Sequence, residues 1–443
     1  MQVRRRIQAL REALLRSIHH QYFVPVCLLA GVLVRLLWIW LVDFDQVSDF
    51  EWYEERGVDL AEGRGYAVDG VPTAYWPIGY PGFLGGVFYL FGHSVLIAKL
   101  LNIALYVGII LLSYRISRRL FHSECAARIT LCLLSFYPNH IAYTAILSSE
   151  ILFLFLFLLS AALFMWARER AGFLALSGLA WGLTTLTKPQ ALILPMIFIL
   201  ADWKSMKSMN SMNSMRSSLR AGVIVYAMLS LTVAPWLLRN YAVFGKPVIC
   251  NTGGINLLDG NNPYATGRKR FDEKVNSLLG NLRTVPLEFM FDGKEVERDA
   301  LAAKIGMDYI IQNPLRTIAL WPKKFVALYL SDVDGIYYSL WMMDVPREKL
   351  RFAFTGTRII AELYYIFIIV LFFVSVPSAL REKKLIGLAI ILYFTLIGLV
   401  LFGNARYHFP IMPWVIIYSG IGGEILLAGQ RAIRTEGGGE PAR

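Results

Sequence analysis

Long runs of apolar residues separated by short polar stretches extend along almost the whole chain. A transmembrane α-helix needs about 20 mainly apolar residues to cross the hydrocarbon core of a bilayer. Residues 128–143 are also apolar, but Tyr137 to His140 interrupt them, which predicts a broken helix held against protein or a water-filled cavity. The pattern predicts an all-α polytopic membrane protein with about ten transmembrane helices. The uninterrupted spans are expected at residues 22–42, 95–114, 151–167, 173–186, 191–203, 221–238, 359–376, 385–402 and 409–427.

Lys and Arg residues gather before the first expected span and in the later connections that fall on the same side of the membrane as this N-terminal segment. Short cytoplasmic loops carry an excess of such residues. We therefore expect a multi-pass protein of the bacterial inner (plasma) membrane with a cytoplasmic N-terminus. One of these connections, residues 204–218, has the low-complexity sequence KSMKSMNSMNSMRSS, which predicts a mobile linker.

Composition agrees with a membrane protein, because 56% of the residues are hydrophobic and only 17% are charged. The formal net charge of +12 could indicate a nucleic-acid-binding protein. However, much of the Lys and Arg lies in the connections that topology requires, and no nucleic-acid-binding motif occurs. The four cysteines have no metal-ligand spacing and do not share one polar loop, so neither a zinc site nor a disulfide framework is predicted.

Two carboxylates are notable for their positions. Asp49 follows the first span by a few residues, so it must lie at the membrane surface, in a loop rich in aromatic residues. There it can act as a general base on a hydroxyl or amine, or it can simply face water. Glu150 begins a long apolar helix. It can favour the positive end of the helix dipole next to a capping Ser148 or Ser149, or it can face the same cavity as Asp49.

Cations occur at outer positions where short loops normally avoid them. Lys188 lies in the turn between two spans, Arg239 ends another span, and Arg406 and His408 open the last one. A cation near the headgroups can hold a phosphate group. Alternatively, each side chain reaches ordinary lipid phosphates. Three such sites on one face favour a shared anionic ligand.

The long region after the sixth uninterrupted span is rich in Gly, Asn and Asp between Gly245 and Pro263. These residues are typical of tight turns with side-chain caps. Asn261 and Asn262 also supply neutral hydrogen-bonding groups of the kind that sugars use. From Asp308 to Lys324 the sequence predicts an amphipathic helix lying in the outer interface.

Several well-known motifs do not occur in the sequence: a Walker loop, a dinucleotide fingerprint, a zinc-protease motif and a nucleophile elbow. An ATP-driven pump and a nicotinamide enzyme are therefore disfavoured. No internal repeat is evident, which argues against a secondary transporter. We predict no metal ion and no cofactor.

The order of these motifs resembles the GT-C superfamily of integral-membrane glycosyltransferases, in particular the bacterial relatives of protein O-mannosyltransferases and of the lipid A aminoarabinose transferase. The resemblance extends from about Leu33 to Ile421. The motifs that carry it are Ser48-Asp49 with Tyr53, Pro77 to Pro81, Ser149-Glu150, Thr187-Lys188-Pro189, Arg239-Asn240-Tyr241, Gly260 to Pro263 and Arg406 to Pro410.

Enzymes of this superfamily pass a sugar from a polyprenyl-phosphate carrier to an acceptor outside the cytoplasm, generally with inversion. The resemblance implies that Asp49 is the general base and that Glu150 is a second acidic group of the cavity. It also implies that the partners are a polyprenyl-phosphate-linked sugar, a lipid, glycan or protein acceptor, and membrane lipids. The donor phosphate would be held by Lys188, Arg239, Arg406 and His408, and the substrate cavity would include Tyr53, Tyr75, Tyr80, Asn261, Asn262 and Tyr407.

The chain departs from this pattern at one place. Relatives often have a basic residue shortly before the proline-rich part of the first loop, where this chain has Ala74-Tyr75-Trp76. The departure puts a second phosphate contact in doubt. The main alternative function is a transporter or flippase of lipid-linked saccharides, which would need polar residues along the membrane midplane. The spans have few such residues, and Arg35, whose depth in the first span is unexplained, is the main exception. A non-catalytic scaffold of an envelope-polymer complex is a third hypothesis.

These inferences divide the chain into five parts. The expected parts are a basic cytoplasmic N-terminus at 1–21, an N-terminal transmembrane catalytic module at 22–239 with a first external loop at 43–94, an extracytoplasmic region with interfacial helices at 240–358, C-terminal transmembrane helices at 359–428 and a cytoplasmic tail at 429–443.

Overall fold

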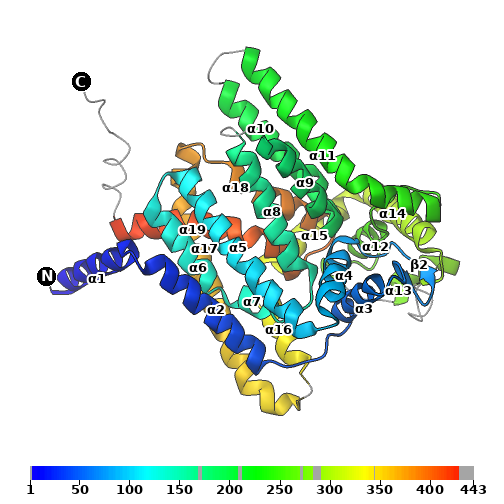
Figure 1. Ribbon diagram of the computed structural model, residues 1–443, viewed down its shortest axis with the longest axis horizontal. Helices are drawn as coiled ribbons and strands as arrows, with labels where there is room; N and C mark the ends of the chain where they lie inside the picture. The colour runs from blue at the N-terminus through cyan, green and yellow to red at the C-terminus, as the bar shows by residue number, and fades with distance from the viewer. Residues whose placement is uncertain are drawn as a thin grey trace.

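The expected helical architecture is present in the computed structural model, which describes residues 2–167, 172–207, 212–269, 273–282, 291–343 and 345–428. Its longer apolar helices pack side by side, and a set of shorter helices covers one end (Figure 1). The helices at the expected spans are α2 (Phe23–Leu41), α5 (Val95–Phe121), α8 (Ser149–Trp166), α9 (Gly172–Thr187), α10 (Leu194–Lys207), α11 (Met212–Phe244), α17 (Arg347–Arg381), α18 (Ile386–Val400) and α19 (Met412–Ala428).

Among the described residues, six helices are long and apolar enough to cross a membrane, and three apolar helices are shorter. Large apolar side chains on α2, α11 and α17 are exposed, including Trp40 at 76%, Val223 at 70% and Phe373 at 66%. Such side chains face water at a high cost but face lipid at none. The protein is therefore a multi-pass membrane protein, and the count of ten spans stays a prediction.

Arg35 explains how the expected broken helix is tolerated. The break separates α6 (Glu124–Ser135) from α7 (Pro138–Tyr143) and leaves carbonyl groups at the end of α6 without helical partners. The buried Arg35 guanidinium donates hydrogen bonds to the carbonyl oxygens of Ser135 (2.8 Å) and Leu134 (3.3 Å). It also lies over the Tyr106 ring, 4.0 Å from its centroid. The charge in the first span thus has a structural role.

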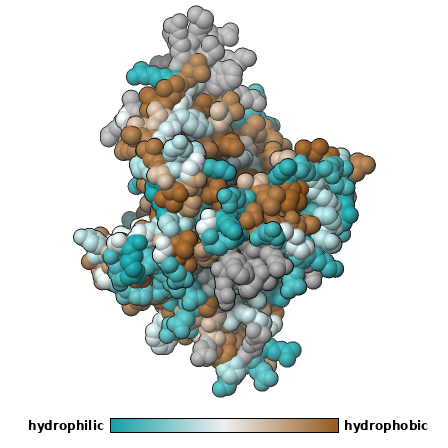
Figure 2. Space-filling view, turned by 90° about the vertical axis from the view of Figure 1, so that its right-hand side faces the viewer, coloured by the Kyte–Doolittle hydropathy of each residue, from teal (hydrophilic) through white to brown (hydrophobic). Residues whose placement is uncertain are grey.

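Shorter elements gather at the end of the molecule opposite the N-terminal helix α1 (Gln2–His19), toward the right and lower parts of Figure 1. We call this the loop end. Figure 2 views it face-on: hydrophilic residues are frequent across its middle, and hydrophobic residues gather above. The elements of the loop end are α3 (Asp49–Ala61), β1 (Ala67–Val68), β2 (Val71–Pro72), α4 (Gly79–Phe91), α12 (Gly253–Gly260), α13 (Glu273–Ser277), η2 (Gly280–Leu282), α14 (Glu295–Gln312), α15 (Pro314–Tyr329) and α16 (Asp334–Trp341).

Two expectations about local structure need correction. The single interfacial helix expected from Asp308 to Lys324 is divided, because α14 ends at Gln312 and α15 begins at Pro314. The residue before a proline disfavours helical geometry, so the division falls at Asn313. The linker expected at residues 204–218 is largely helical, since α10 extends to Lys207 and α11 begins at Met212. Residues 208–211 of the linker and the expected tail at 429–443 lie outside the described residues.

A buried carboxylate joins the first loop to the long region that follows α11. Glu295, at the start of α14, accepts hydrogen bonds from the Thr73 hydroxyl (2.7 Å), the Ala74 amide (2.6 Å) and the Asn251 side chain (2.9 Å). Its exposed fraction is only 2%. Because one carboxylate satisfies three donors from two segments, the two segments are held in a fixed relation.

Candidate active site

The local chain geometry brings Asp49 to the loop end at the first turn of α3. Ser48, the residue before it, has φ 57° and ψ −128°, a conformation that costs a residue other than glycine free energy. Helix α3 buries Phe50 and Tyr53 against the bundle, which leaves Asp49 half-buried beside them. One Asp49 oxygen accepts a hydrogen bond from Nη1 of Arg406 at 3.0 Å.

Glu150 lies in the first turn of α8 and is completely buried. Its Oε1 accepts hydrogen bonds from Nε of Arg406 (2.6 Å) and Nζ of Lys188 (2.9 Å), and Oε2 accepts one from Nη2 of Arg406 (3.3 Å). Ser148 makes no side-chain capping bond at this helix start. Glu150 therefore binds the two cations, whatever it also contributes to the helix dipole.

Close backbone packing determines the position of Lys188. This residue follows the last residue of α9, and Pro189 begins the short 3-10 helix η1 (Pro189–Ile193) directly after it. Gly79, at the start of α4, lies so close to Thr187 that an added Cβ would be 2.6 Å from the Thr187 backbone. Only glycine permits this approach, so the proline-rich part of the first loop packs directly behind Lys188.

Arg406 comes from the opposite end of the chain. It lies in η4 (Ala405–Ile411), where the Asn404 side chain caps the helix start by accepting a hydrogen bond from the Arg406 amide at 2.9 Å. The guanidinium also lies near the Phe50 ring, with its central carbon 5.4 Å from the ring centroid. Arg406 thus connects α3, α8 and the start of the last apolar helix.

We call Asp49, Glu150, Lys188 and Arg406 the ionic cluster. Two carboxylates and two cations make it formally neutral. The side chains of Lys188 and Arg406 are 17% and 16% exposed, whereas Glu150 is at 0%. Glu150 thus forms the buried base of the cluster, and the two cations and Asp49 face the accessible side. Such an arrangement can bind an anion beside a proton-accepting carboxylate.

Aromatic residues expected in the substrate cavity lie next to this cluster. Tyr53 packs edge-on against Tyr80, with ring centroids 5.4 Å apart, and also contacts Trp76 at 6.3 Å. Burial raises the pKa of Tyr53, and the Asp49 carboxylate adds to the effect. Tyr75 is buried against Trp76 at 4.9 Å. Tyr407 directly follows Arg406 and packs on Phe402 at 5.2 Å.

The structure does not bring four of the expected site residues into the ionic cluster. Arg239 donates hydrogen bonds to the carbonyl oxygens of Thr73 and Tyr66, so its guanidinium holds the first loop. His408 is buried, with Nε2 3.0 Å from an Asp332 carboxylate oxygen and Nδ1 against the Leu328 carbonyl. These contacts engage both side chains within the protein, and their role as phosphate ligands stays a prediction.

The two asparagines expected in the substrate cavity are also buried in the scaffold. The Asn261 amide group donates to the carbonyl oxygens of Leu257 and Val400, and its oxygen accepts a hydrogen bond from Lys324 at 3.1 Å. Asn262 donates to the carbonyl at Leu258, one turn earlier. Both side chains serve the turn chemistry that the sequence also allowed.

Sequence reasoning missed two carboxylates near the site. Asp332 accepts hydrogen bonds from Tyr137 and Asn139, which attaches α7 to the segment before α16. Asp334, at the first position of α16, lies in the field of Arg406, and burial raises the pKa of its carboxyl group to about 6. The only sequence signal was the pair of acids in Asp332-Val333-Asp334-Gly335.

Comparison with known proteins supports the likeness suggested by these motifs. Residues 76–237 match the family model described as dolichyl-phosphate-mannose-protein mannosyltransferase. The structure is similar to the oligosaccharyltransferase AglB of Archaeoglobus fulgidus, solved with an inhibitory peptide and a dolichol-phosphate, with TM-score 0.52, 14% identity and 96% of this chain covered. The chain has a GT-C fold. This confirms the resemblance to the GT-C superfamily, and the family-model match adds a sequence relation to the O-mannosyltransferases.

Two further solved structures are similar to this chain. A structure of the Archaeoglobus fulgidus oligosaccharyltransferase tethered to an acceptor peptide gives TM-score 0.53 and 12% identity over 94% of this chain. ArnT from Cupriavidus metallidurans bound to undecaprenyl phosphate gives TM-score 0.46 and 14% identity, covering 93% of this chain and 79% of that one. This chain spans about half the length of the two archaeal chains, 52% and 51%. No curated protein matches the sequence.

Proposed function

We propose that the protein is a glycosyltransferase that moves a sugar from a polyprenyl-phosphate-linked donor to an acceptor at the extracytoplasmic face of the membrane. The observation that carries the proposal is the ionic cluster, in which a half-buried Asp49 carboxylate and the cations Lys188 and Arg406 share one partly accessible site. The GT-C fold agrees with it, as does the dolichol-phosphate bound to AglB.

In this proposal the reaction needs one base and an anion-binding group. An acceptor hydroxyl attacks the anomeric carbon of the sugar, and Asp49 takes the hydroxyl proton. The bond between the anomeric carbon and the phosphate oxygen breaks, and the phosphate leaves with the electron pair. Lys188 and Arg406 stabilise the charge that develops on this leaving group, so it needs no proton. Attack opposite the leaving group inverts the anomeric centre.

Glu150 has a positioning role in this mechanism. Its two oxygens hold Nζ of Lys188 and the guanidinium of Arg406 from the buried side. A pre-oriented pair of cations needs less reorganisation when the phosphate charge develops. The ammonium group of Lys188 has three N–H donors, and Glu150 takes one, so donors remain for a phosphate.

The proposal also assigns the topology. The loop end would be extracytoplasmic and the N-terminus cytoplasmic, in a bacterial plasma membrane, with residues 22–239 as the catalytic module and 240–358 as the external region. Cysteine accessibility in intact cells tests this. A single cysteine at the exposed Asp69 of the first loop should react with a membrane-impermeant maleimide, and one at Gln8 should react only after lysis.

The decisive experiment compares wild type with Asp49→Asn. Purified protein is incubated with a radiolabelled polyprenyl-phosphate sugar and envelope lipid extract. General-base catalysis contributes about 10²–10⁴-fold, so Asp49→Asn should lose about a hundredfold or more of the transfer rate. Asp69→Asn, the same change in the same loop, is the matched control and should retain the rate. Equal transfer by wild type and Asp49→Asn would overturn the proposal, and lipid scrambling without transfer would favour a flippase.

A further inference from the structure

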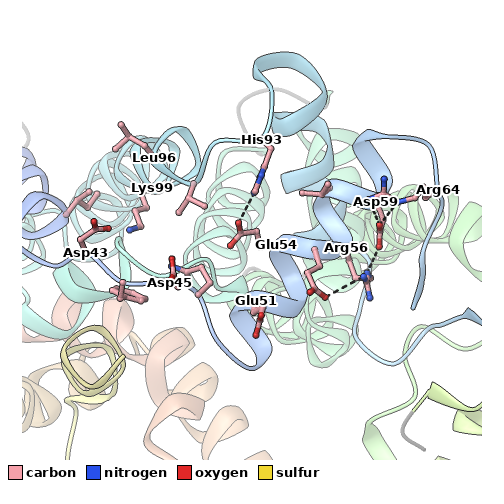
Figure 3. Close-up of a pocket in the computed structure, with 16 residues that line it drawn as sticks. Asp43, Asp45, Glu51, Glu54, Arg56, Asp59, Arg64, His93, Leu96 and Lys99 are labelled. Carbon is pink, nitrogen blue, oxygen red and sulfur yellow. Dashed lines mark hydrogen bonds and ion pairs between the residues drawn. The ribbon is translucent and has the colours of Figure 1, made fainter. Parts of the chain in front are cut away.

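A cavity of about 800 Å³ lies on the other side of α3 from the buried face that carries Phe50 and Tyr53. It is formed by the connection between α2 and α3, by α3 itself and by the start of α5, and Figure 3 shows its lining. No residue of the ionic cluster lines it. The charged lining residues are Asp43, Asp45, Glu51, Glu54, Glu55, Asp59, Arg56, Arg64 and Lys99, together with His93.

In one half of this cavity the charged side chains form ion pairs with one another. Asp59 binds Arg56 at 2.7 Å and Arg64 at 2.6 Å. Glu54 accepts a contact from His93 at 2.7 Å. These ion pairs, drawn as dashed lines in Figure 3, satisfy the charges on the α3 side. On this side of the cavity no ligand is needed to balance the charges.

The other half has unpaired carboxylates. Asp43, Asp45 and Glu51 make no hydrogen bond or ion pair with any other described residue. All three side chains are exposed to the cavity and the surrounding solvent. Their charges outnumber the single unpaired cation of this half, Lys99. The whole lining has six carboxylates against three permanent cations, so the cavity attracts positive charge.

Two side chains in the same half, Lys99 and Gln46, have donor groups without a hydrogen-bond acceptor among the described residues. Lys99 is only 5% exposed, lies 5.1 Å from the Phe44 ring centroid, and makes no hydrogen bond or ion pair within the described part of the chain. Figure 3 shows its ammonium group between Asp43 and Asp45. Gln46 is 6% exposed, and its Nε2 has no partner, whereas its Oε1 accepts the Leu147 amide at 2.9 Å. The unpaired buried Nε2 of Gln46 is costly, and a ligand with an acceptor group that satisfies it would also lie near the Lys99 ammonium in the same cavity.

The required ligand therefore combines opposite charges. It must present an anionic or acceptor group to Lys99 and Gln46, and a cationic donor to Asp43, Asp45 and Glu51. A simple anion is disfavoured by the excess of carboxylates. A bound metal ion is not supported, because no group of three potential ligands lies together among the described residues. A zwitterion with a primary ammonium meets both requirements.

The surroundings of the cavity indicate a lipid. Its apolar lining residues Ile39, Val95 and Leu96 come from α2 and α5, the two apolar helices that flank the opening. Leu96 is 57% exposed, and Trp40, next to Ile39 on α2, is 76% exposed. Aromatic and apolar residues exposed at a helix end are typical of the interface between headgroups and acyl chains. The cavity thus lies at headgroup level.

We propose that this cavity binds the headgroup of a phospholipid with a primary ammonium, with the phosphate at Lys99 and Gln46 and the ammonium at Asp43, Asp45 and Glu51. The site is separate from the proposed transferase site and does not depend on it. A primary ammonium donates three hydrogen bonds to the carboxylates, whereas the quaternary ammonium of a choline headgroup donates none. The carboxylates therefore discriminate between the two headgroups.

Lipid titration of the full chain tests the proposal. Delipidated protein in detergent is titrated with phosphatidylethanolamine, phosphatidylcholine or phosphatidylglycerol of identical acyl chains, and bound lipid is counted by native mass spectrometry. Loss of one charge-assisted hydrogen bond weakens binding by about tenfold or more. We expect phosphatidylethanolamine to bind at least about tenfold tighter than phosphatidylcholine, and phosphatidylglycerol to bind most weakly.

Substitutions test the contacts at the ammonium and at the phosphate separately. Asp45→Asn, at an exposed position, should bring phosphatidylethanolamine binding down toward that of phosphatidylcholine. Lys99→Met should weaken the binding of both lipids, with its melting temperature checked for folding. The exposed Glu62 lies outside the cavity, so Glu62→Gln is the control and should bind like wild type. Equal binding of the ethanolamine and choline lipids by wild type, or preference for phosphatidylglycerol, would overturn the proposal.

Discussion

Replacing Glu150 with Gln distinguishes a carboxylate that holds two cations from one that merely begins a helix. The side chain is fully buried and accepts hydrogen bonds of 2.6, 2.9 and 3.3 Å from Arg406 and Lys188. Glu150→Gln leaves these two cations with only Asp49 as a counter-ion. Removing one partner from a buried ion pair costs about 3–5 kcal/mol. A helix-dipole role alone is worth only about 0.3–1 kcal/mol, so the size of the loss decides between the two roles.

A ligand measurement makes this test specific to the phosphate site. Polyprenyl phosphate would supply the negative charge that Glu150→Gln removes, so it should raise the melting temperature of the variant more than that of wild type. At a ligand concentration of 100 times Kd, binding stabilises the folded state by about 2.7 kcal/mol.

Glu295→Gln is the matched control, because Glu295 is also a buried carboxylate, 2% exposed, but its hydrogen-bond donors include Thr73 and Asn251 rather than cations. This variant should lose stability without a larger ligand response. The reasoning is refuted if polyprenyl phosphate shifts the melting temperatures of Glu150→Gln and Glu295→Gln equally, or if Glu150→Gln is as stable as wild type.

Changes elsewhere test the packing and the protonation of the site. Gly79→Ala should lower the transfer rate and the melting temperature, because its Cβ would lie 2.6 Å from the backbone of Thr187 beside Lys188; unchanged kinetics would contradict the close-packing argument. Burial raises the pKa of Asp334 from 3.8 to about 6, so the folded state keeps this proton to a higher pH, and the associated stability is full below about pH 4 and lost as the pH rises through about 6. Asp334→Asn mimics the protonated form and should therefore be more stable than wild type at pH 7 by about 3 kcal/mol at most, with little difference at pH 4 in thermal denaturation. Arg35→Met should destabilise the protein by removing the guanidinium donors from the end of α6, and a melting temperature equal to that of wild type would show that the contact is dispensable.

The apolar pattern was sufficient to predict the helices of the bundle and the break at Tyr137, because a membrane imposes hydrophobicity and length on each span separately. Charge parity could not predict the division between α14 and α15 or the helical ends of the 204–218 tract. These depend on local backbone preferences and on packing at each position. Whether ten segments span the bilayer also depends on how the shorter helices tilt and pack.

The candidate site shows what a linear pattern leaves undetermined. Residues as distant as Asp49 and Arg406 were each selected by an unusual position in a loop or at a helix end, and the structure brings them within 3.0 Å. The same criterion also selected Arg239 and His408, whose partners are backbone carbonyls and a second carboxylate. A Lys or Arg at an outer position where such residues are uncommon indicates that some negative group lies nearby. It does not indicate whether that group belongs to a substrate or to the protein.

The contact between Arg35 and the end of α6 has a consequence for biogenesis. An arginine near the centre of an isolated spanning helix raises the insertion free energy by about 2.5–3.5 kcal/mol, so α2 enters the bilayer with an unfavourable charge. The carbonyl groups at Leu134 and Ser135 that bind this charge are synthesised about a hundred residues later. Until then Arg35 can donate only to a carbonyl of its own helix, that of Gly31. Once α6 is inserted, its last carbonyl groups accept hydrogen bonds from Arg35, and Arg35 supplies the donors that the end of α6 needs. The pairing of α2 with α6 therefore favours the assembly of the bundle.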